Sequence, residues 1–366
     1  MKVGVVGGGQ LGRMMGLAGI PLGLEFRFLD PVREAPAAAV GELVVGALDD
    51  PTALRTLAKG VDRLTYEIEN IDVAPLAALT PAPAPPIEAL AVAQDRCQEK
   101  AMFEALEIPV AAYAIVASAE DLAGAAAGVG FPAVLKATRM GYDGRGQRFV
   151  DNEAQLRAAW QDLTSDTAIL ESRIDFDREV SMIGVRSADG DHRFYPLTEN
   201  RHEDGILRVS RAPAAAAAAV EQQARRHLAA IMAEVDYVGV LTVEFFQQGN
   251  RLLANEMAPR VHNSGHWTIE GAVTSQFENH LRAICGLPLG SAESLGFAAM
   301  VNLLGSIPPA EQLLADPELH LHDYGKSPRS NRKVGHCTLV DSDSRRLAQR
   351  LETLQQRLDQ GVGPGD

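Results

Sequence analysis

The chain opens with the stretch MKVGVVGGGQLGRMM (residues 1–15), in which an apolar run gives way to glycines. Val3 to Val6 is short and rich in valine, as in a buried strand, and an apolar pattern of helical spacing follows the glycines. The stretch therefore predicts a strand, a tight turn and a helix. Backbone N–H groups at the start of such a helix bind phosphate or another anion, and Gly7-x-Gly9-x-x-Gly12 also fits the dinucleotide fingerprint.

The same alternation continues downstream. Residues 24–29, 43–45 and 63–66 have strand patterns, and Asp50-Pro51 begins a helical pattern with proline in its first turn. Strands that alternate with helices predict a parallel, doubly wound α/β sheet, a Rossmann-like domain. The segment TPAPAPP (80–86) interrupts the alternation, so we expect a linker or a domain edge there.

Beyond this segment the pattern is mixed. Residues 113–150 suggest a small α+β unit, a strand-like run recurs at Phe194–Thr198, and the alanine-rich segment 214–235 predicts a helix by propensity alone. The last ~70 residues have the pattern of a further small mixed domain. A length of 366 residues is consistent with two or three domains.

Charge and composition limit the class of partner. The chain has 48 acidic and 34 basic residues, for a net charge of −14, which argues against a general nucleic-acid binder. Its three cysteines are widely spaced and form no disulfide or metal-binding pattern. No apolar run reaches the roughly 18–20 residues of a membrane helix. We therefore expect a cytoplasmic protein that binds neither nucleic acid nor a membrane.

Lysine is scarce, which makes each lysine worth inspecting. It occurs only at positions 2, 59, 100, 136, 326 and 333. Lys136 lies on a predicted strand, residues 133–137, and the glycine-rich segment GYDGRGQ (141–147) follows it. Such a loop approaches phosphates closely and would place them against the Lys136 ammonium. The spacing is not that of a Walker A loop, and an ordinary glycine-rich hairpin also fits it.

A pair of glutamates gives the strongest local argument. Residues 240–246 and 251–257 have strand patterns, and a hairpin centred near Asn250 sets Glu244 directly opposite Glu256. Opposed like charges on one face repel each other, and a divalent cation relieves the repulsion. Two carboxylates suit Mg²⁺, with Asn255 or Asn263 as a further ligand. The alternative is two solvated glutamates on an open face.

The segment RVHNSGH (260–266) follows this hairpin. His262 and His266 have the i, i+4 spacing that binds zinc on a helix, but Asn-Ser-Gly between them disfavours helix. We therefore interpret Arg260, His262 and Asn263 as an anion pocket beside the magnesium site, with a structural polar turn as the alternative.

Together these motifs resemble the ATP-grasp superfamily and, within it, the N5-carboxyaminoimidazole ribonucleotide synthases of the purine pathway. The matching segments run in the family's order along nearly the whole chain. They are GGGQLGRM (7–14), YEIENI (66–71), QDRCQEK (94–100), GYDGRGQ (141–147), EVS (179–181), ENRHEDGIL (199–207), VEFF (243–246), NEMAPRVHNSGHWTIEGAVTSQFENHLRAICGLPLG (255–290) and YGKSPRSNRKVGH (324–336).

The resemblance implies an α/β fold in three parts. Residues 1–93 would form a Rossmann-like domain and residues 94–295 an ATP-grasp domain, with a small lid at about 113–166. Residues 296–366 would form the small mixed C-terminal domain. It also implies the reaction: ATP phosphorylates bicarbonate to carboxyphosphate, which carboxylates the amine of 5-aminoimidazole ribonucleotide and leaves ADP and phosphate. Mg²⁺, or Mn²⁺ in its place, would be the cofactor, and a homodimer the assembly.

The resemblance further assigns roles to residues. ATP would be bound by Arg96, Lys136, Gly141, Tyr142, Asp143, Gly144, Arg145, Gly146, Gln147, Glu171, Ser172, Arg173, Ile174, Glu179, His202, Asn255 and Glu256. The metal ligands would be Glu244 and Glu256. Arg260, His262, Asn263 and Lys326 would surround bicarbonate or carboxyphosphate, and Asp143 would accept a proton from the amine or orient it. The ribonucleotide would be held by Gln10, Leu11, Glu69, Tyr142, Asp143, Arg145, Lys326, Arg332 and Lys333.

Three alternatives remain at this point. One is another ATP-grasp ligase or transformylase that acts on a different ribonucleotide. Another, of a different class, is an NAD(P)-dependent dehydrogenase, supported by the first glycine motif and by Asp30 about 20 residues after it. It gives no role to Glu244 or Glu256. The third is a catalytically inactive binding subunit, against which Lys136 and the two glutamates argue.

Overall fold

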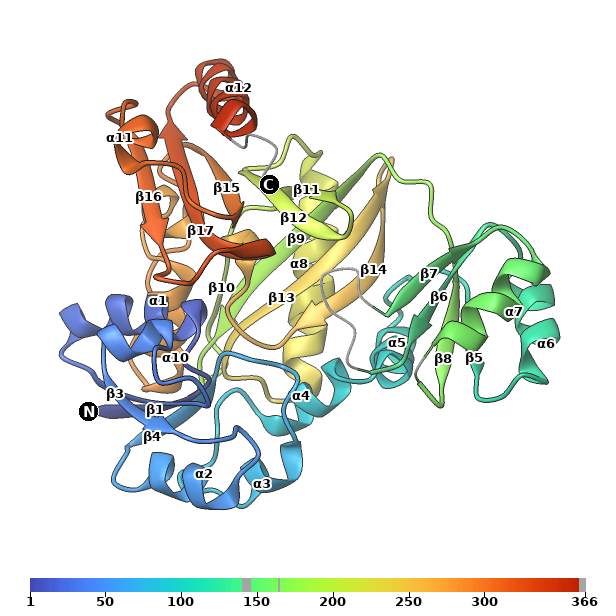
Figure 1. The fold of residues 1–366 in the computed structure, drawn as a ribbon, viewed down its shortest axis with the longest axis horizontal. Coiled ribbons are helices and arrows are strands. Elements are labelled where there is room, and N and C mark those ends of the chain that lie inside the picture. Colours follow the sequence, from blue (N-terminus) through green and yellow to red (C-terminus); the bar gives the residue numbers. More distant parts are fainter. Residues whose placement is uncertain (140–145, 164, 362–366) are drawn as a thin grey trace.

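The N-terminal part forms a parallel sheet, as its alternating pattern predicts. The computed structural model describes residues 1–139, 146–163 and 165–361. The sheet has the order β3-β2-β1-β4, and every pairing in it is parallel. Figure 1 shows this sheet at the lower left, beside the N-terminus. Its elements are β1 (Lys2–Val6), α1 (Gln10–Gly19), η1 (Ile20–Leu22), β2 (Glu25–Asp30), η2 (Pro36–Ala39), β3 (Glu42–Val45), α2 (Pro51–Ala58) and β4 (Arg63–Tyr66).

Alternate residues of these strands serve two cores. Val3 and Val5 pack with α1 in one core, whereas Val6 and Leu64 pack with α2 in the other. Successive side chains of a strand point to opposite faces, so helices cover both faces of the sheet. The proline-rich segment 80–86 lies along β4, where the Ala84 N–H donates to the Leu64 carbonyl at 2.9 Å. It therefore extends the edge of the sheet before the chain continues into α4.

A small antiparallel sheet forms a separate layer, at the right of Figure 1. Its strand order is β5-β8-β6-β7, and α6 and α7 share a core with it. The sequence indicates the strand at 133–137 but not its partner β7, in which Gln147 pairs with Lys136. The chain first passes through α3 (Val73–Ala77) and α4 (Ile87–Ala93), which pack in the core of the N-terminal part. The elements that follow, in and around this layer, are α5 (Arg96–Ala105), β5 (Tyr113–Val116), α6 (Asp121–Val129), β6 (Ala133–Ala137), β7 (Gln147–Val150), α7 (Glu153–Asp162) and β8 (Ala168–Ser172).

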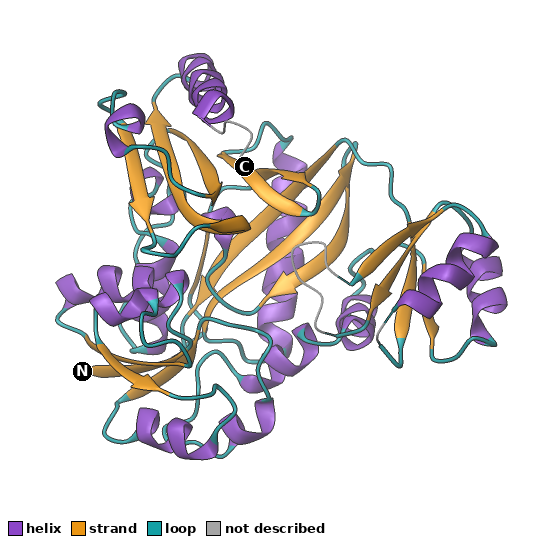
Figure 2. Cartoon of the chain, viewed as in Figure 1, coloured by secondary structure: helices purple, strands orange, loops and turns teal. Residues whose placement is uncertain are grey.

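The largest sheet crosses the middle of the molecule (Figure 2). Its strands follow the order β14-β13-β9-β11-β12-β15-β17-β16, with β10 paired to β9, and α8 packs against β9, β13 and β14. Its first strands and helix are β9 (Arg178–Arg186), β10 (His192–Phe194), β11 (Thr198–Glu203), β12 (Ile206–Ala212), α8 (Ala218–Glu234), β13 (Gly239–Gln248) and β14 (Arg251–Ala258). The expected strand at Phe194–Thr198 is wrong, because Pro196 lacks the N–H that a ladder needs and the chain passes there from β10 to β11.

The C-terminal part continues the same sheet. β12 pairs with β15, so strands on either side of residue 295 belong to one sheet. Its elements, with those that lead to it, are η3 (Asn263–Gly265), α9 (Thr268–Gly271), α10 (Gln276–Ile284), β15 (Phe297–Gly305), α11 (Ala310–Leu313), β16 (Leu319–Asp323), β17 (Arg329–Asp341) and α12 (Ser344–Gly361). Among the described helices, none is both long enough and apolar enough to cross a membrane.

Candidate active site

The hairpin of β13 and β14 sets Glu244 opposite Glu256, as the sequence predicts, but by a different route. The turn is Gly249-Asn250, and a regular ladder counted from that turn would set Glu244 opposite Asn255. A register shift after Glu244 makes Asn255 an extra residue on β14, which is a β-bulge. The bulge moves Glu256 to the position opposite Glu244.

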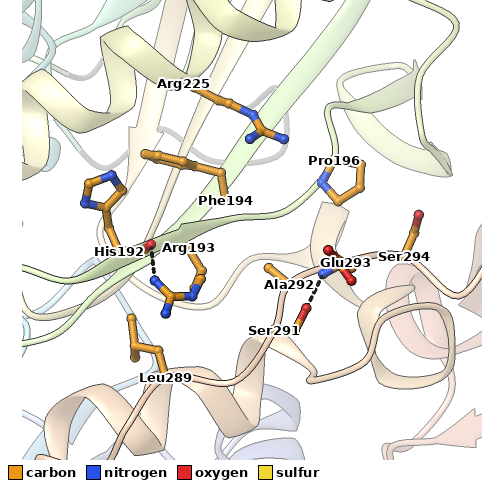
Figure 3. Close-up of a pocket in the computed structure, with 10 residues that line it drawn as sticks. All are labelled: His192, Arg193, Phe194, Pro196, Arg225, Leu289, Ser291, Ala292, Glu293 and Ser294. Carbon is orange, nitrogen blue, oxygen red and sulfur yellow. Dashed lines mark hydrogen bonds between the residues drawn. The ribbon is translucent and has the colours of Figure 1, made fainter.

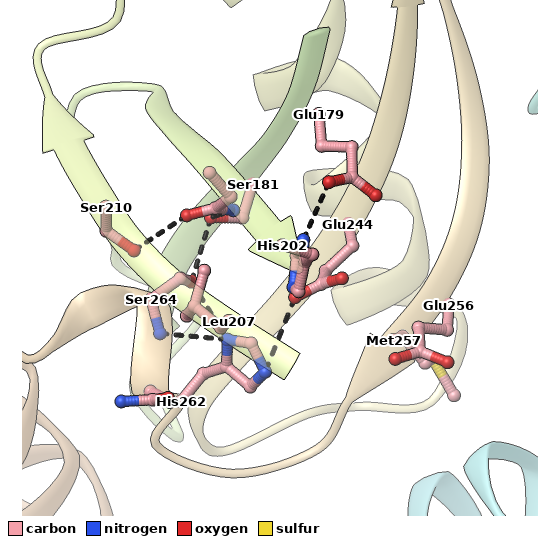
Figure 4. Close-up of polar contacts among 12 residues, drawn as sticks. Glu179, Ser181, His202, Leu207, Ser210, Glu244, Glu256, Met257, His262 and Ser264 are labelled. Carbon is pink, nitrogen blue, oxygen red and sulfur yellow. Dashed lines mark hydrogen bonds and ion pairs between the residues drawn. The ribbon is translucent and has the colours of Figure 1, made fainter. Parts of the chain in front are cut away.

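The two carboxylates differ in their electrostatic surroundings, although both belong to one site (Figure 4). Burial raises the pKa of Glu244 to about 7, and the facing Glu256 adds to the rise. Burial acts on Glu256 as well, but Arg96 and Lys136 outweigh it and lower the pKa of that carboxyl. Arg96 Nη1 lies 3.3 Å from Glu256 Oε2. Nearby cations thus keep Glu256 ionised, whereas burial favours the protonated form of Glu244.

The oxygens at this pair suit a hard cation. Beside the glutamates, the side-chain oxygen of Asn255 is buried and has no hydrogen-bond partner in the structure. Within the described residues, no group of three or more His, Cys, Asp or Glu side chains is arranged to hold a metal. Mg²⁺ usually binds through one or two carboxylates and takes further ligands from water and substrate phosphates. Two carboxylates with one amide oxygen therefore fit Mg²⁺, or Mn²⁺ by the same preference for oxygen.

Residues predicted to bind the nucleotide lie between helix α5 and the β13–β14 hairpin. Lys136 Nζ pairs with Glu171 Oε2 at 2.8 Å, and Lys100 Nζ lies 3.7 Å from the other oxygen of Glu171. Burial alone would raise the pKa of Glu171, but the two lysines hold it at about 2. Arg96 begins the same helix and reaches Glu256. The structure therefore brings Arg96, Lys136 and Glu256 together, with Lys100 behind them.

The backbone N–H groups just after Glu171 are already hydrogen-bonded within the chain. β8 has neighbours on both sides, β5 and β6. The Ser172 N–H donates to the Ala112 carbonyl at 2.8 Å, and the Arg173 N–H donates to the Pro132 carbonyl at 3.0 Å. Of the four successive residues 171–174 predicted to bind ATP, Ile174 is therefore the first whose amide lies beyond these bonds.

His202 and Glu179 face each other across β11 and β9. His202 Nδ1 lies 2.7 Å from Glu179 Oε2. Burial opposes the charged imidazole, but Glu179 and Glu244 outweigh it and raise the pKa of His202. Figure 4 shows His202 between these two glutamates. Two residues predicted at the nucleotide site thus adjoin the carboxylate pair.

A line of hydrogen bonds ends at His262, whose Nε2 lies 3.6 Å from Glu244 Oε1. Its Nδ1 is bonded to Ser264 Oγ at 2.8 Å and also accepts from the Ser264 N–H at 3.3 Å. Since Nδ1 accepts, the proton of a neutral imidazole lies on Nε2 and faces Glu244. The line continues through three buried residues of the central sheet, which sequence reasoning missed: Ser181, Asn200 and Ser210 (Figure 4).

The His266 ring packs against other residues than the His262 ring does. Residues 263–265 form a single 3-10 turn, and His262 caps its start. The chain between the two histidines is therefore not an α-helix, as the Asn-Ser-Gly sequence predicts. His266 is buried against Phe277 and His336 instead. The two histidines with i, i+4 spacing therefore belong to different surroundings.

Arg260 lies against Glu69 from the N-terminal part. Its Nη2 is 3.0 Å from Glu69 Oε1, and its buried Nε has no hydrogen-bond partner in the structure. Gln94 holds the backbone around Glu69 by donating to the carbonyls of Glu69 and Ile71, at 2.6 Å each. Arg260 and Glu69, which the sequence places in separate pockets, thus form one ion pair.

The first glycine turn is filled from within the chain, which overturns the expected anion site at those amides. The Glu67 carboxylate accepts from the Gly9 N–H and, at 2.5 Å, from the Gly12 N–H. Asp30 accepts from the Gly8 N–H at 3.0 Å. A Cβ on Gly9 would lie 2.7 Å from Glu67 Oε1, so the glycine makes room for this carboxylate. Because Asp30 is bonded to this turn, it is not available to bind the ribose of a dinucleotide. This removes the argument for an NAD(P)-binding site.

The start of α1 meets the C-terminal loop at Gln10. Lys326 Nζ donates to Gln10 Oε1. Burial lowers the pKa of Lys326 to about 8, although the nearby Glu67 opposes this. The Leu11 side chain is buried in the core, so the predicted ligand contact at this residue falls to its backbone N–H. Gln10 and Lys326, predicted to bind the same substrate, are thus in contact.

Two further cations of that loop lie at different places. Arg332 donates to the backbone and hydroxyl oxygens of Ser327, at 3.1 and 2.9 Å. Lys333 is close enough to the candidate metal site to oppose the rise in the pKa of Glu244 and, after burial and Arg260, to contribute to the lowered pKa of His262. Lys333 therefore adjoins the carboxylate pair, whereas Arg332 supports its own loop.

Asn263 is held by a residue that sequence reasoning did not single out. Its Nδ2 donates to Asn302 Oδ1 at 3.0 Å, and Asn302 Nδ2 donates to Asn263 Oδ1 at 2.7 Å. Both ends of the Asn263 amide are engaged, so it lies beside the candidate pocket with its polar atoms already used. Nothing in the local sequence around Asn302 signals this pairing, which joins residues far apart in the chain.

Part of the predicted nucleotide loop is described. Gly146 has a left-handed φ of +74°, and its carbonyl accepts from the Ala137 N–H at 2.8 Å. Gln147 begins β7 beside Lys136. The remaining predicted residues of this loop, Gly141, Tyr142, Asp143, Gly144 and Arg145, lie outside the described residues.

A hollow of about 860 Å³ lies elsewhere on the surface (Figure 3). It is formed by β10, the residues Pro196 and Arg225, and the segment 289–294. Arg193 and Arg225 are each paired with an acidic neighbour, Asp191 and Glu221. No predicted site residue lines this hollow.

Models of three families match successive parts of the chain. The ribonucleotide synthetase preATP-grasp domain matches residues 1–94, the ATP-grasp domain residues 101–277, and the phosphoribosylaminoimidazole carboxylase C-terminal domain residues 298–350. The fold and these matches define an ATP-grasp ligase. A Pseudomonas aeruginosa protein named N5-carboxyaminoimidazole ribonucleotide synthase is 48% identical over 357 residues, which cover 97% of this chain and 99% of that protein. The chain belongs to the N5-carboxyaminoimidazole ribonucleotide synthase family, whose known reaction is the ATP-dependent carboxylation of 5-aminoimidazole ribonucleotide.

Solved structures of the family agree with the fold over the whole chain. The synthetase from Thermus thermophilus has a TM-score of 0.93 and 50% sequence identity, and the match covers 100% of both chains. The synthase from Aspergillus clavatus, solved with ADP and 5-aminoimidazole ribonucleotide, has a TM-score of 0.90 and 31% identity, and the match covers 98% of each chain.

Proposed function

We propose that this chain uses ATP and bicarbonate to carboxylate 5-aminoimidazole ribonucleotide at its amine, with carboxyphosphate as the intermediate. The observation that carries the proposal is the convergence of Glu244, Glu256, Arg96 and Lys136 in one buried site of an ATP-grasp fold. Bicarbonate oxygen attacks the γ-phosphorus of ATP, ADP leaves, and the ribonucleotide amine then attacks the carboxyl carbon and displaces phosphate. The products are N5-carboxyaminoimidazole ribonucleotide, ADP and phosphate.

The first step requires charge neutralisation and alignment more than covalent help. Arg96 and Lys136 bind the phosphates in this proposal, and Lys136 is fixed against Glu171 at 2.8 Å before any nucleotide arrives. Glu244 and Glu256, with Asn255, hold Mg²⁺. The cation, when bound, neutralises charge on the phosphate oxygens. Glu179 and His202 are the proposed ribose and nucleotide contacts beside that pair.

The acyl acceptor side lies where the N-terminal sheet meets residues 260–266. Arg260 and His262 form the proposed bicarbonate pocket, with Lys326 at its C-terminal loop, and Asn263 shapes the pocket through Asn302. Glu69, which already pairs with Arg260, faces the aminoimidazole in this proposal. Asp143, with Tyr142 and Arg145, orients the amine in this proposal. Orientation is its main role because an arylamine is already nearly neutral, so no proton has to be removed before it attacks.

The ribonucleotide phosphate needs a revised position. Because Glu67 takes the amides of Gly9 and Gly12, we assign the phosphate to the Gln10 and Leu11 amides and to Lys326. Arg332 and Lys333 are the further proposed contacts to this phosphate. Although their own partners differ, both lie near enough to Lys326 to help lower its pKa. The N-terminus of α1 still favours an anion there, since its dipole points the same way.

The test is ADP release by the purified chain with bicarbonate and each of several aminoribonucleotides. We expect ADP release that depends on both bicarbonate and 5-aminoimidazole ribonucleotide, and transfer of labelled carbonate to the product. Stimulation by a different aminoribonucleotide alone would favour another ATP-grasp ligase or transformylase and would reject this proposal. The same assay without bicarbonate serves as the control for uncoupled ATP hydrolysis.

We also propose that the chain acts in the cytoplasm as a homodimer, with domain boundaries near residues 93 and 295. The first two statements follow from the resemblance to the N5-carboxyaminoimidazole ribonucleotide synthase family. The three family matches support the boundaries, because the first ends at residue 94, the second covers residues 101–277 and the third begins at residue 298. Light scattering of the eluting protein tests the dimer, and limited proteolysis tests the boundaries.

A further inference from the structure

The β-bulge at Asn255 is held from outside the sheet. β14 is an end strand in its sheet, so the groups on its outer edge bond to other parts of the chain. Lys100 Nζ donates to the carbonyls of Ala254 and Asn255, at 3.2 and 2.9 Å. Glu99 Oε1 accepts from the Met257 N–H at 2.6 Å. These bonds lie on both sides of Glu256 and fix the backbone through the bulge.

The two side chains that make these bonds are buried charges. Lys100 is 0% exposed and Glu99 is 1% exposed. Burying such groups costs free energy that apolar side chains of similar size would not cost, so their contribution here is not simple packing. What they add is polar bonds to the backbone on either side of the bulge, along the outer edge of β14, where its sheet has no further strand.

Helix α5 also carries the contacts that reach the nucleotide side. Arg96, Glu99 and Lys100 have the i, i+3, i+4 spacing that puts side chains on one helix face. Arg96 pairs with Glu256, and Lys100 lies 3.7 Å from the Glu171 carboxylate that holds Lys136. One rigid helix face therefore touches both the hairpin glutamate and the partner of the phosphate-binding lysine.

We propose that Lys100 and Glu99 are positioning residues that lock the bulge at Asn255 and so set Glu256 opposite Glu244 for a divalent cation. The inference rests on the proposed role of that glutamate pair. Neither side chain touches a ligand. Lys100 and Glu99 act through the β14 backbone, and Lys100 acts also through Glu171.

The test compares two buried variants with a matched control. Lys100→Met removes the ammonium and nearly keeps the volume, and Glu99→Met removes the acceptor for the Met257 N–H. Glu99→Gln keeps a carbonyl oxygen at that place and serves as the control. Binding of Mn²⁺ in the presence of ADP, followed by electron paramagnetic resonance, is the first readout, and the Mg²⁺ concentration for half-maximal turnover is the second.

We expect Lys100→Met and Glu99→Met to weaken Mn²⁺ binding by about tenfold or more, the effect typical of groups that orient metal ligands. The half-saturating Mg²⁺ concentration rises in parallel, and Glu99→Gln stays close to wild type. Leu351→Ala is the control for lowered stability. It removes a buried side chain from the C-terminal core and should lower thermal stability without touching the glutamate pair. Its Mn²⁺ affinity is expected to be that of wild type.

Unchanged Mn²⁺ affinity in a folded Lys100→Met variant overturns the proposal, whatever its thermal stability. If Lys100→Met does not fold, equal affinities of Glu99→Met and Glu99→Gln overturn it instead. The cation measurement uses no aminoribonucleotide. A wild-type chain that binds Mn²⁺ with ADP but does not carboxylate 5-aminoimidazole ribonucleotide would therefore reject the proposed reaction, and the variants would still decide the positioning role.

Discussion

Two polar sites of this molecule, the glycine turn after β1 and the glutamate pair on strands β13 and β14, differ in how their polar groups are satisfied. At the first, the amides of Gly9 and Gly12 bond to Glu67 within the chain. At the second, two glutamates face each other, and the Asn255 side-chain oxygen beside them is buried without a hydrogen-bond partner in the structure. Buried polar atoms are nearly always bonded, so the second arrangement calls for a ligand and the first does not.

This difference shows that a sequence match to a ligand-binding motif does not reveal whether the protein itself fills the site. The glycine turn fits the dinucleotide fingerprint, but its glycines accommodate a carboxylate of the same chain. The hairpin matches no short motif, and its signal is an electrostatic conflict that a cation resolves.

The largest effect should come from removing charge at the hairpin. We expect Glu256→Gln to lower turnover by about 10²–10³-fold, because a charge-stabilising group at the phosphoryl transfer site is lost. Steady-state ADP release at saturating ATP measures it. Arg251→Ala, at the exposed start of β14, is the control and should be neutral. Full turnover in Glu256→Gln would contradict the proposed metal role.

The glycine turn should respond in stability rather than in chemistry. Gly9→Ala places a Cβ 2.7 Å from Glu67 Oε1, so we expect a loss of about 1–3 kcal/mol in the free energy of unfolding from the crowding. Denaturant titration measures it. Gly124→Ala in α6 has nothing within 4 Å of its Cβ and should be neutral or slightly stabilising. Equal losses in the two variants would mean that Glu67 does not fill the turn.

Lys326 links the first turn to the substrate and should impose a pH dependence. With its pKa lowered to about 8, the ammonium is present below that pH and is lost above it. We expect kcat/KM for the ribonucleotide to fall by up to about tenfold per unit as pH rises beyond 8. A pH profile measures it, and Lys326→Arg, which stays charged, should flatten the fall. A profile identical in both enzymes would argue against the assignment.

The smallest effect should come from the hydrogen-bond line that ends beside the hairpin. Ser264→Ala removes the hydroxyl bonded to His262 Nδ1 at 2.8 Å, so we expect roughly a fivefold loss of kcat/KM for bicarbonate, equivalent to one neutral hydrogen bond. Nitrogen NMR of the imidazole should show a larger share of the other tautomer. Ser264→Thr keeps a hydroxyl and is the rescue variant. An unchanged tautomer in Ser264→Ala would remove any influence of this line on the site.

Local pattern predicted those parts of the fold in which neighbours in sequence decide the outcome. The strands and helices of the N-terminal sheet follow from alternation of apolar runs and turns, and the parallel order follows from that alternation. The pattern did not indicate β7, because this strand is short and partly exposed and forms through its pairing with β6. The strand expected at 194–198 failed at Pro196, a residue whose missing N–H is visible in the sequence.

The candidate site shows the same division. The sequence pointed to Glu244 and Glu256 as an opposed pair, but that prediction assumed a hairpin centred on Asn250. The actual turn and the bulge at Asn255 shift the register in compensating ways. A bulge disrupts the ladder locally, and side chains of α5 bond the backbone of β14 on either side of this one.

The amino-acid sequence alone determined the family, the alternation of the first sheet and the residue types of the site, because these depend on order and spacing along the chain. Tertiary structure alone decided which of the two candidate ligand sites, the glycine turn and the glutamate pair, is filled by the protein and which is left for a ligand. Glu67 reaches amides 55 or more residues away, and Lys100 reaches carbonyls about 155 residues away. Contacts of that span depend on how whole layers pack, and spacing in the sequence does not record them.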